Sequence, residues 1–216
     1  MKKQQLTECP LFYGLGEHEI EDALSLFSAT QISYEKGAHI MTLSDKSTQF
    51  WLVLSGTVHV CCDDEEGHHM IMAVVTPFHT FGESLCYLGL HSGVYAEAKT
   101  NVTLLSLDGS ILREPPHSSL QFLLQQRFTA MLARKALEMN ARIQILCKRS
   151  IRDKIFAMFT HYGGQSNGRA FSLPFDRAGM AFYLGVDRSA LSRELCRLED
   201  GGYISFSKNE FYWHFH

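Results

Sequence analysis

The 216-residue sequence contains no continuous apolar run long enough to cross a membrane. Its first residues, MKKQQLTECPLFYGL, have a basic start but lack the apolar core of a signal peptide, so we expect a cytoplasmic protein with no membrane partner. Its six cysteines show no CxxC spacing, which argues against the usual thiolate metal sites. We therefore expect reduced thiols, several of them packed as small apolar side chains.

The chain also lacks an excess of basic residues, because 20 Lys and Arg stand against 23 Asp and Glu, for a net charge of -3. The charge is unevenly distributed. Residues 1–146 hold 10 basic and 16 acidic residues, whereas residues 147–216 hold 10 basic and 7 acidic residues. The C-terminal part is therefore locally positive, which is compatible with binding to phosphates and predicts only modest non-specific affinity.

The most informative stretch is residues 174–204, where two amphipathic helical patterns meet at Gly185. In the first pattern Met180, Ala181 and Leu184 share a face, and Asp176 can cap the helix start. The small Ala181 lets a second helix cross closely, and a glycine can adopt the positive φ of a tight turn between helices. The pattern predicts a helix-turn-helix of the type that reads DNA.

In the second pattern Leu191, Leu195 and Leu198 face inward, and Asp187 is the expected cap. The outward residues supply guanidinium and hydroxyl groups suited to phosphates and base edges: Arg188, Ser189, Ser192, Arg193 and Arg197. Two alternating runs, 203–206 and 210–215, then predict a β-hairpin wing. The alternative is an ordinary amphipathic helix pair with solvated arginines.

The first hundred residues have a different texture, with short strand-like runs at 49–54, 58–62, 70–75 and 102–107. Residues 64–67, DEEG, form a turn signal between two of these runs, and residues 17–27 read as a short amphipathic helix. This spacing of runs and turns is typical of small all-β barrels and sandwiches.

A long helical pattern follows Pro115-Pro116 and runs from about residue 118 to 147. Its apolar positions recur with heptad spacing, as in a seam between two helices. The predicted seam comprises Phe128, Leu132, Ala136, Met139, Ile143 and Leu146. We interpret it as a dimer seam, the alternative being a helix that packs only on its own β domain.

Three motifs in this order resemble the Crp/Fnr family of bacterial transcription regulators: FWLVLSGTV at 50–58, FGES at 81–84 and GVDRSALSREL at 185–195. The resemblance implies an α+β fold with three parts. The first part (1–115) is a double-stranded β-helix, that is, a jelly-roll-like β-roll that senses an effector. The second (116–147) is a long dimerisation helix, and the third (148–216) is a C-terminal winged helix-turn-helix that binds DNA. It further implies a non-enzymatic, effector-controlled homodimer on a palindromic operator in double-stranded DNA, with RNA polymerase as a partner if the protein activates transcription.

The resemblance places Arg188, Ser189 and Arg193 at the base-reading positions, with Ser192 beside them. The family branches that the helix most resembles have a glutamate where Ser189 stands, and that glutamate accepts a hydrogen bond from cytosine N4. We therefore expect the half-site to differ at that base pair.

The same resemblance suggests an effector pocket, whose candidate residues are Gly82, Glu83, Ser84, Tyr95, Met139 and Asn140. In the cyclic-nucleotide members an Arg-Ser pair holds the cyclic phosphate, but Ser92 and Gly93 occupy those positions here. Without the guanidinium, a charge-assisted contact is lost, so we do not expect cyclic AMP to be the effector. An effector bound between the β-roll and the long helix would shift the conformation of the seam and of a hinge at residues 148–152. That shift would rotate the two winged domains into register with a palindromic site.

Two branches of the family carry a cofactor. The iron-sulfur branch needs several N-terminal cysteines, and only Cys9 is present there. Residues 90–98, LHSGVYAEA, resemble the segment of a haem-dependent gas sensor, with His91 as the possible axial ligand. The effector itself is left unidentified by the sequence.

Two further classes compete with a DNA-binding regulator. A cupin-like metal-dependent enzyme would need three or four converging His and Glu ligands, and His79 with Glu83 is the nearest approach. A cyclic-nucleotide-binding adaptor without DNA binding would leave the predicted recognition helix without a role. We expect no metal site.

Overall fold

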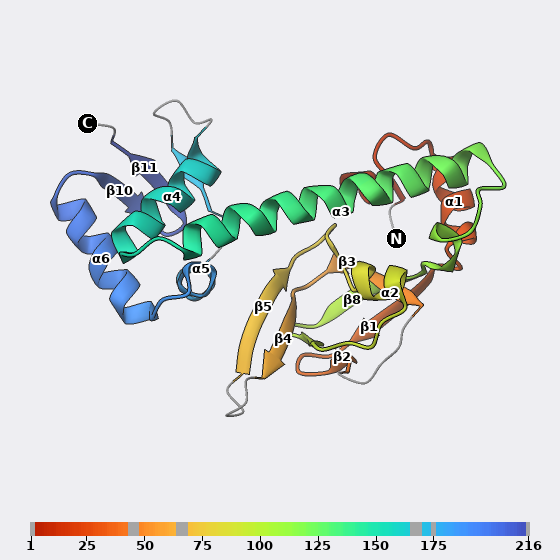
Figure 1. Cartoon of the computed structure of the whole chain (residues 1–216), viewed down its shortest axis with the longest axis horizontal. Coiled ribbons are helices and arrows are strands. Elements are labelled where there is room, and N and C mark those ends of the chain that lie inside the picture. The colour runs from red at the N-terminus through yellow and green to blue at the C-terminus, as the bar shows by residue number, and fades with distance from the viewer. Residues whose placement is uncertain (1–2, 43–47, 64–68, 165–169, 174–175, 215–216) are drawn as a thin grey trace. The chain divides into compact units, whose positions relative to one another are not determined.

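A computed structural model describes residues 3–42, 48–63, 69–164, 170–173 and 176–214 (Figure 1). The chain divides into two compact units, Met1–Arg134 and Lys135–His216, and the division falls inside one long helix. The first unit contains η1 (Lys3–Glu8), α1 (Glu17–Leu26), β1 (Thr30–Tyr34), β2 (His39–Met41), β3 (Gln49–Ser55), β4 (Val58–Asp63), β5 (His69–Val75), β6 (Thr80–Phe81), α2 (Glu83–Leu88), β7 (Tyr95–Ala98), β8 (Val102–Asp108), η2 (Ser110–Leu112) and the first half of α3 (Ser119–Leu146).

Two four-stranded antiparallel sheets form the β-roll of the first unit, in the orders β1-β8-β3-β6 and β2-β7-β4-β5. Side chains from both sheets meet in one core, with Trp51 and Val53 from β3 facing Val58 from β4 and Ala96 and Ala98 from β7. The strands expected at 49–54, 58–62, 70–75 and 102–107 are confirmed within a residue at each end. The turn expected at 64–67 lies outside the described residues.

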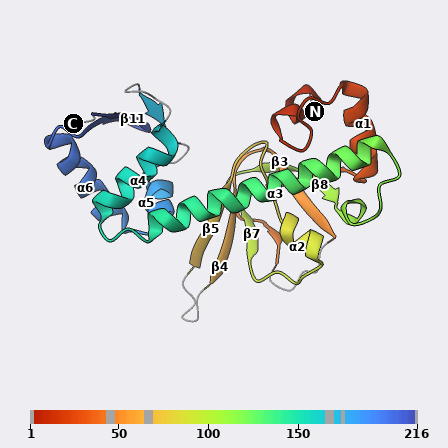
Figure 2. The same ribbon diagram turned by 45° about the horizontal axis from the view of Figure 1, so that its top comes forward.

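A second core covers the other face of the first sheet, where α1 lies beside the N-terminal half of α3 (Figure 2). A row of aromatic rings crosses it: Phe12 to Phe27 at 6.3 Å between centroids, Phe27 to Phe50 at 5.8 Å, and Phe50 to Phe128 at 5.8 Å. The first two pairs pack edge to face, which stabilises beyond burial alone. Cys9 is buried in this core as a small apolar side chain.

Phe128 corrects the predicted dimer seam. Its side chain is 2% exposed in the core of its own unit, so it is not available to a second copy. The later seam positions behave differently: Ala136 is exposed, Met139 is 65% exposed and Ile143 is 54% exposed in the single chain. The seam candidates that remain therefore lie mainly in the second half of α3.

The second unit contains the end of α3, α4 (Ile151–Gly163), β9 (Phe171–Ser172), α5 (Arg177–Leu184), α6 (Arg188–Asp200), β10 (Ile204–Ser207) and β11 (Glu210–Trp213). Its three strands form one antiparallel sheet in the order β10-β11-β9. At the centre of its core, the Phe159 ring lies 4.9 Å from that of Phe211 and 5.2 Å from that of Phe171. Neither α4 nor β9 was predicted from the sequence.

Candidate nucleic-acid interface and effector site

The turn between α5 and α6 is built as the sequence predicts. Asp176 caps α5 by accepting a hydrogen bond from the backbone N–H of Gly179 at 2.7 Å. Gly185 ends the helix with φ at +60°, a left-handed conformation that a side chain makes costly. The backbone N–H of Val186 then donates to the Ala181 carbonyl at 3.0 Å, which closes the turn.

Helix α6 presents one apolar and one polar face. Leu191, Leu195 and Leu198 are buried on α5 and the hairpin. All five predicted DNA-contacting side chains are exposed on the same helix: Arg188, Ser189, Ser192, Arg193 and Arg197. The helix is thus fixed by its leucines while its polar face stays open to a ligand.

Hydrogen bonds organise the N-terminal turn of this polar face. Asp187 accepts from the Ala190 N–H at 2.9 Å as the helix cap and from the Ser189 hydroxyl at 2.5 Å. The Ser189 oxygen in turn accepts from the Arg193 guanidinium at 3.2 Å. The hydrogen bond from Ser189, followed by the backbone hydrogen bond from Ala190, lowers the pKa of the Asp187 carboxyl.

Two of the other three polar side chains of the face, Ser192 and Arg197, have partners on the helix itself. Ser192 donates its hydroxyl to the Arg188 carbonyl at 3.0 Å, and Arg197 contacts Glu194 at 3.4 Å. No hydrogen bond or ion pair involves the Arg188 guanidinium within the described parts of the chain. This arginine is therefore available to a phosphate or a base edge.

The predicted wing is the β10–β11 hairpin, in which Ile204 pairs with Trp213 and Ser207 with Glu210. Lys208 lies exposed at its tip with φ at +54°. Two arginines stack on aromatic rings next to it: Arg177 lies 4.6 Å from the Phe206 ring centroid, and Arg152 lies 4.3 Å from that of Tyr203. Burial lowers the pKa of Arg177. Phe215, the end of the predicted run, lies outside the described residues.

The end of α3 is fastened to α5 by contacts that the sequence did not predict. The Arg142 guanidinium lies 4.8 Å from the Phe182 ring centroid and 5.4 Å from that of Tyr183. Ile145 is buried with the core of the second unit. Burial, and then the hydrogen bond to Tyr183, raise the pKa of Tyr162 on α4 well above its usual range. Together these contacts join three helices, α3, α4 and α5.

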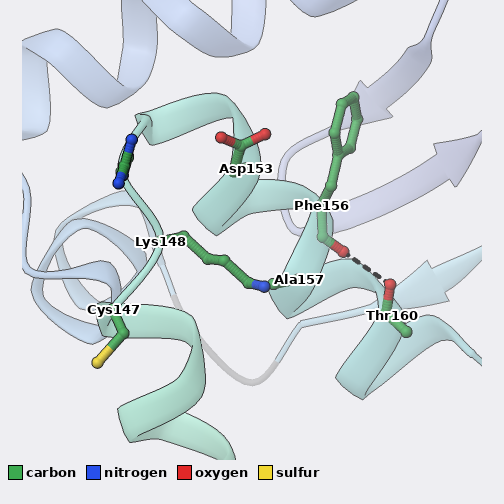
Figure 3. A pocket seen from close by; sticks show the side chains of 7 residues that line it. Cys147, Lys148, Asp153, Phe156, Ala157 and Thr160 are labelled. Atoms are coloured by element: carbon green, nitrogen blue, oxygen red, sulfur yellow. Dashed lines mark hydrogen bonds between the residues drawn. The ribbon is translucent and has the colours of Figure 1, made fainter.

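An open cavity of 480 Å³ lies where α3 gives way to α4 (Figure 3). Ser150 caps α4 by accepting a hydrogen bond from the Asp153 N–H at 3.0 Å, and Thr160 donates to the Phe156 carbonyl at 2.9 Å. The side chains that line the cavity are Cys147, Lys148, Arg149, Asp153, Phe156, Ala157 and Thr160. None of the predicted effector residues lines this cavity.

The predicted effector residues are divided between the two units. Gly82 precedes α2 with φ at +83°, Glu83 is 5% exposed, and Ser84 is exposed. A Cβ on Gly82 would lie 2.9 Å from the Trp51 ring, so the indole packs directly on this backbone. Met139 and Asn140 are exposed on α3 in the second unit.

Tyr95, a further predicted effector residue, lies in β7. Its neighbours in β7, Ala96 and Ala98, face the core between the sheets, and the alternation of a strand turns Tyr95 to the other face. There its hydroxyl donates to Asp63 at 2.9 Å, and its ring lies 5.6 Å from that of His39. Burial and this hydrogen bond raise the pKa of Tyr95 to about 12.

Comparison with known proteins agrees with this arrangement. Residues 31–114 match the family described as the cyclic nucleotide-binding domain. The Cyclic AMP receptor protein of Thermus thermophilus is 28% identical over 200 residues, which cover 90% of this chain and 88% of that protein. FixK2 of Bradyrhizobium japonicum has a similar fold, with a TM-score of 0.61 and 21% identity over 87% of this chain and 93% of that one. So does a CRP/FNR-family transcriptional regulator of Thermus thermophilus, with a TM-score of 0.55 and 22% identity over 86% of this chain and 94% of that one.

The chain is similar to proteins of the Crp/Fnr family over most of its length. Its mixed helix and sheet architecture, with a jelly-roll-like domain followed by C-terminal helices, is that of the solved Crp/Fnr structures. Because Crp/Fnr proteins are transcription regulators rather than enzymes, the cupin-like enzyme is set aside. No helix in the described ranges is both long and apolar enough to cross a membrane.

The cofactor-bearing Crp/Fnr branches find little support in the geometry. Cys9 is fully buried in the first core, away from solvent. His91 is exposed, and neither cavity described for this chain, the one at Cys147 or a smaller one of 160 Å³ next to Gln31, includes it. Outside the gaps in the description, no group of three or more His, Cys, Asp or Glu residues is placed to hold a metal ion.

Proposed function

We propose that this protein acts as a homodimeric transcription regulator that binds a palindromic operator in double-stranded DNA under the control of an effector. The observation that carries the proposal is the exposed polar face of α6 on a buried leucine face. This helix is long enough to lie in a major groove, whose width admits an α-helix.

The chemistry of that face favours DNA over other partners. Arg188 and Arg193 can each donate two hydrogen bonds to guanine O6 and N7, the commonest specific contact in the major groove. Lys208 at the wing tip and Arg197 offer positive charge for phosphates. An adaptor that only bound a nucleotide would have no use for this arrangement.

The dimer is supported by the exposed apolar side chains of the second half of α3. Leu137, Met139 and Ile143 are each more than half exposed in the single chain. Covering such side chains with a second copy removes apolar surface from water, and each heptad position would meet its symmetry mate. A two-fold dimer can place two recognition helices about 34 Å apart, one DNA turn.

The effector is proposed to act in the first unit and not to be cyclic AMP. The Ser92 hydroxyl is buried and donates to the Val94 carbonyl, and the neighbouring Gly93 has no side chain. Trp51 stacks on Phe81 at 5.3 Å and packs on Gly82. A cyclic phosphate near α2 would therefore meet an indole and no guanidinium from these positions. The contact from Thr80 in the β-roll to Met131 on α3 at 3.5 Å gives an effector a route to the long helix.

The test is selection from a randomised duplex library by the purified full-length chain. Parallel samples receive cyclic AMP or a protein-free small-molecule extract of bacterial cells as a source of effectors. We expect enrichment of a palindrome with half-sites one helical turn apart, stronger enrichment with the extract, and no response to cyclic AMP. Light scattering on the same protein should give the mass of a dimer.

Arg193→Ala should weaken the enrichment and remove the preference at one base pair of each half-site. Thr160→Ala, which removes a hydroxyl from α4 in the same unit, serves as the matched control and should enrich the same palindrome as the unaltered chain. Absence of any enriched sequence in all samples would contradict DNA recognition, and a non-palindromic sequence would contradict the dimer. RNA polymerase becomes a partner in the proposal only if the operator confers activation. An absorbance spectrum with a Soret band lost in His91→Ala would replace the proposed effector with a haem-bound gas.

A further inference from the structure

The residue of α6 that departs from its family relatives, Ser189, has both sides of its hydroxyl engaged within the helix. Its hydrogen goes to the Asp187 carboxylate at 2.5 Å. Its oxygen accepts from the Arg193 guanidinium at 3.2 Å. The three side chains therefore form one continuous chain of hydrogen bonds, from the helix cap through a hydroxyl to an arginine one turn further along.

This arrangement restricts what Ser189 can offer to DNA. A serine hydroxyl has a single hydrogen to donate, and here Asp187 holds it. Asp187 is a strong acceptor because its carboxylate is ionised, as its lowered pKa indicates. Donation to a base would therefore require Ser189 to give up a charge-assisted hydrogen bond at the helix cap.

The arrangement has the opposite effect on Arg193. An exposed arginine samples many side-chain conformations and loses that freedom when it binds a base. A hydrogen bond to Ser189 holds one Nη of the guanidinium to the helix, and the remaining N–H groups stay available for a base. Such pre-organisation lowers the entropic cost of binding.

From this geometry we infer that Ser189 is a positioning residue, which orients Arg193 for its base through the Asp187–Ser189–Arg193 chain and does not itself read a base. Direct readout by α6 then rests on the guanidinium groups of Arg188 and Arg193. The base pair that a glutamate would read at this position is left unspecified by Ser189. This inference rests on the proposed function, because it describes how the same helix recognises its operator.

Library selection with single variants separates positioning from direct reading. Arg193→Ala identifies the base pair that Arg193 specifies, as the position whose preference disappears. Ser189→Ala should weaken the preference at that same position and lower affinity for the selected operator by about 2- to 10-fold, the loss expected when one long side chain is no longer ordered before binding. Ser189→Thr keeps the hydroxyl and should restore both. Thr160→Ala controls for the loss of a hydroxyl elsewhere in the unit.

Two results would overturn the inference. If Ser189→Ala removes the preference at a different base pair, Ser189 reads that base directly. If Ser189→Ala leaves every preference and the affinity unchanged, Arg193 needs no positioning by the hydroxyl.

A measurement without DNA distinguishes failure of this inference from failure of the proposed function. Titration of the Asp187 carboxyl by carbon NMR should show its pKa rising toward the ordinary aspartate range in Ser189→Ala, because its largest stabilising contact is lost. An unchanged titration would show that the hydrogen-bond chain is absent and would overturn the inference alone. A shifted titration in a protein that selects no sequence would overturn DNA recognition, and with it the reading assigned to Arg193.

Discussion

Replacing Gly185 with alanine should destabilise the second unit through two separable effects. The backbone there has φ at +60°, and a left-handed conformation costs a residue with a Cβ about 1–2 kcal/mol. The new Cβ would also lie 3.1 Å from Cδ2 of Leu146, closer than ordinary contact. Leu146 is 36% exposed and can shift, so this second contribution should be the smaller. We expect a total loss of about 1–3 kcal/mol in the free energy of unfolding.

The assay is urea unfolding followed by the fluorescence of Trp213, which lies in the second unit. A Trp51→Phe background removes the tryptophan of the first unit, so the signal reports on one cooperative unit. Gly202→Ala is the matched control, because Gly202 has φ at +73° with no atom within 4 Å of a built Cβ. It should show the backbone cost alone. If Gly185→Ala leaves the midpoint of urea unfolding unchanged, the positive φ at this position does not require glycine and the argument for a strained turn is refuted.

Three further predictions follow from burial and charge. Ile143→Glu should shift the mass measured by light scattering from dimer to monomer. Phe128→Ala should instead lower the free energy of unfolding of the first unit by about 3–5 kcal/mol. If Phe128→Ala dissociated the dimer and Ile143→Glu did not, the seam would include Phe128 after all. The pKa of Asp187 is depressed in the folded state, so its contribution to the free energy of unfolding should be fully present above the ordinary aspartate pKa and lost as pH falls through the lower folded value. Asp187→Asn should remove that part of the acid dependence in unfolding curves measured at a series of pH values. Exposed Cys147 and Cys196 should react with a thiol reagent in the native protein well before Cys61 and Cys86, because burial raises the pKa of those two thiols to about 11. Equal reaction rates would contradict the burial of Cys61 and Cys86.

The parts of the interface that could be predicted from the sequence depend on short-range chemistry. A capping aspartate acts on a backbone N–H three residues away, as Asp176 and Asp187 do here. A positive φ between two helices selects glycine at 185 from the local turn alone. Such signals do not depend on the rest of the fold, so they can be interpreted in isolation.

The incorrect placement of Phe128 in the seam has a different cause, which is that periodicity reveals an apolar face but not what covers it. Phe128 fits the heptad seam in spacing, yet it packs against Phe50 because α3 has an apolar face toward its own unit as well. For the same reason the sequence does not show which face of β7 Tyr95 lies on, since that is decided by Ala96 and Ala98, which fill the core. Only the assembled sheets decide these orientations.

The clamp at Arg142 could not be predicted for a related reason. Its aromatic partners, Phe182 and Tyr183, are forty residues further along the chain, and nothing in the local pattern of α3 indicates them. A cation over an aromatic ring needs only proximity, which has no fixed spacing in sequence. The wing arginines, Arg152 and Arg177, illustrate the same point.

The assignment of Lys135–Leu146 of α3 to the same compact unit as α6 has a consequence for protein engineering. If copies associate through Met139 and Ile143, this module carries both its own pairing surface and the helix proposed to bind DNA, and the first unit, proposed to bind the effector, becomes exchangeable. When a foreign ligand-binding domain is grafted ahead of residue 135, the rotation of that domain about the helix axis then decides whether the chimaera functions. One inserted residue turns the junction by about 100°, while seven residues return it close to register. A series of junction lengths should therefore yield functional chimaeras with a period of about 3.6 residues, the helical repeat.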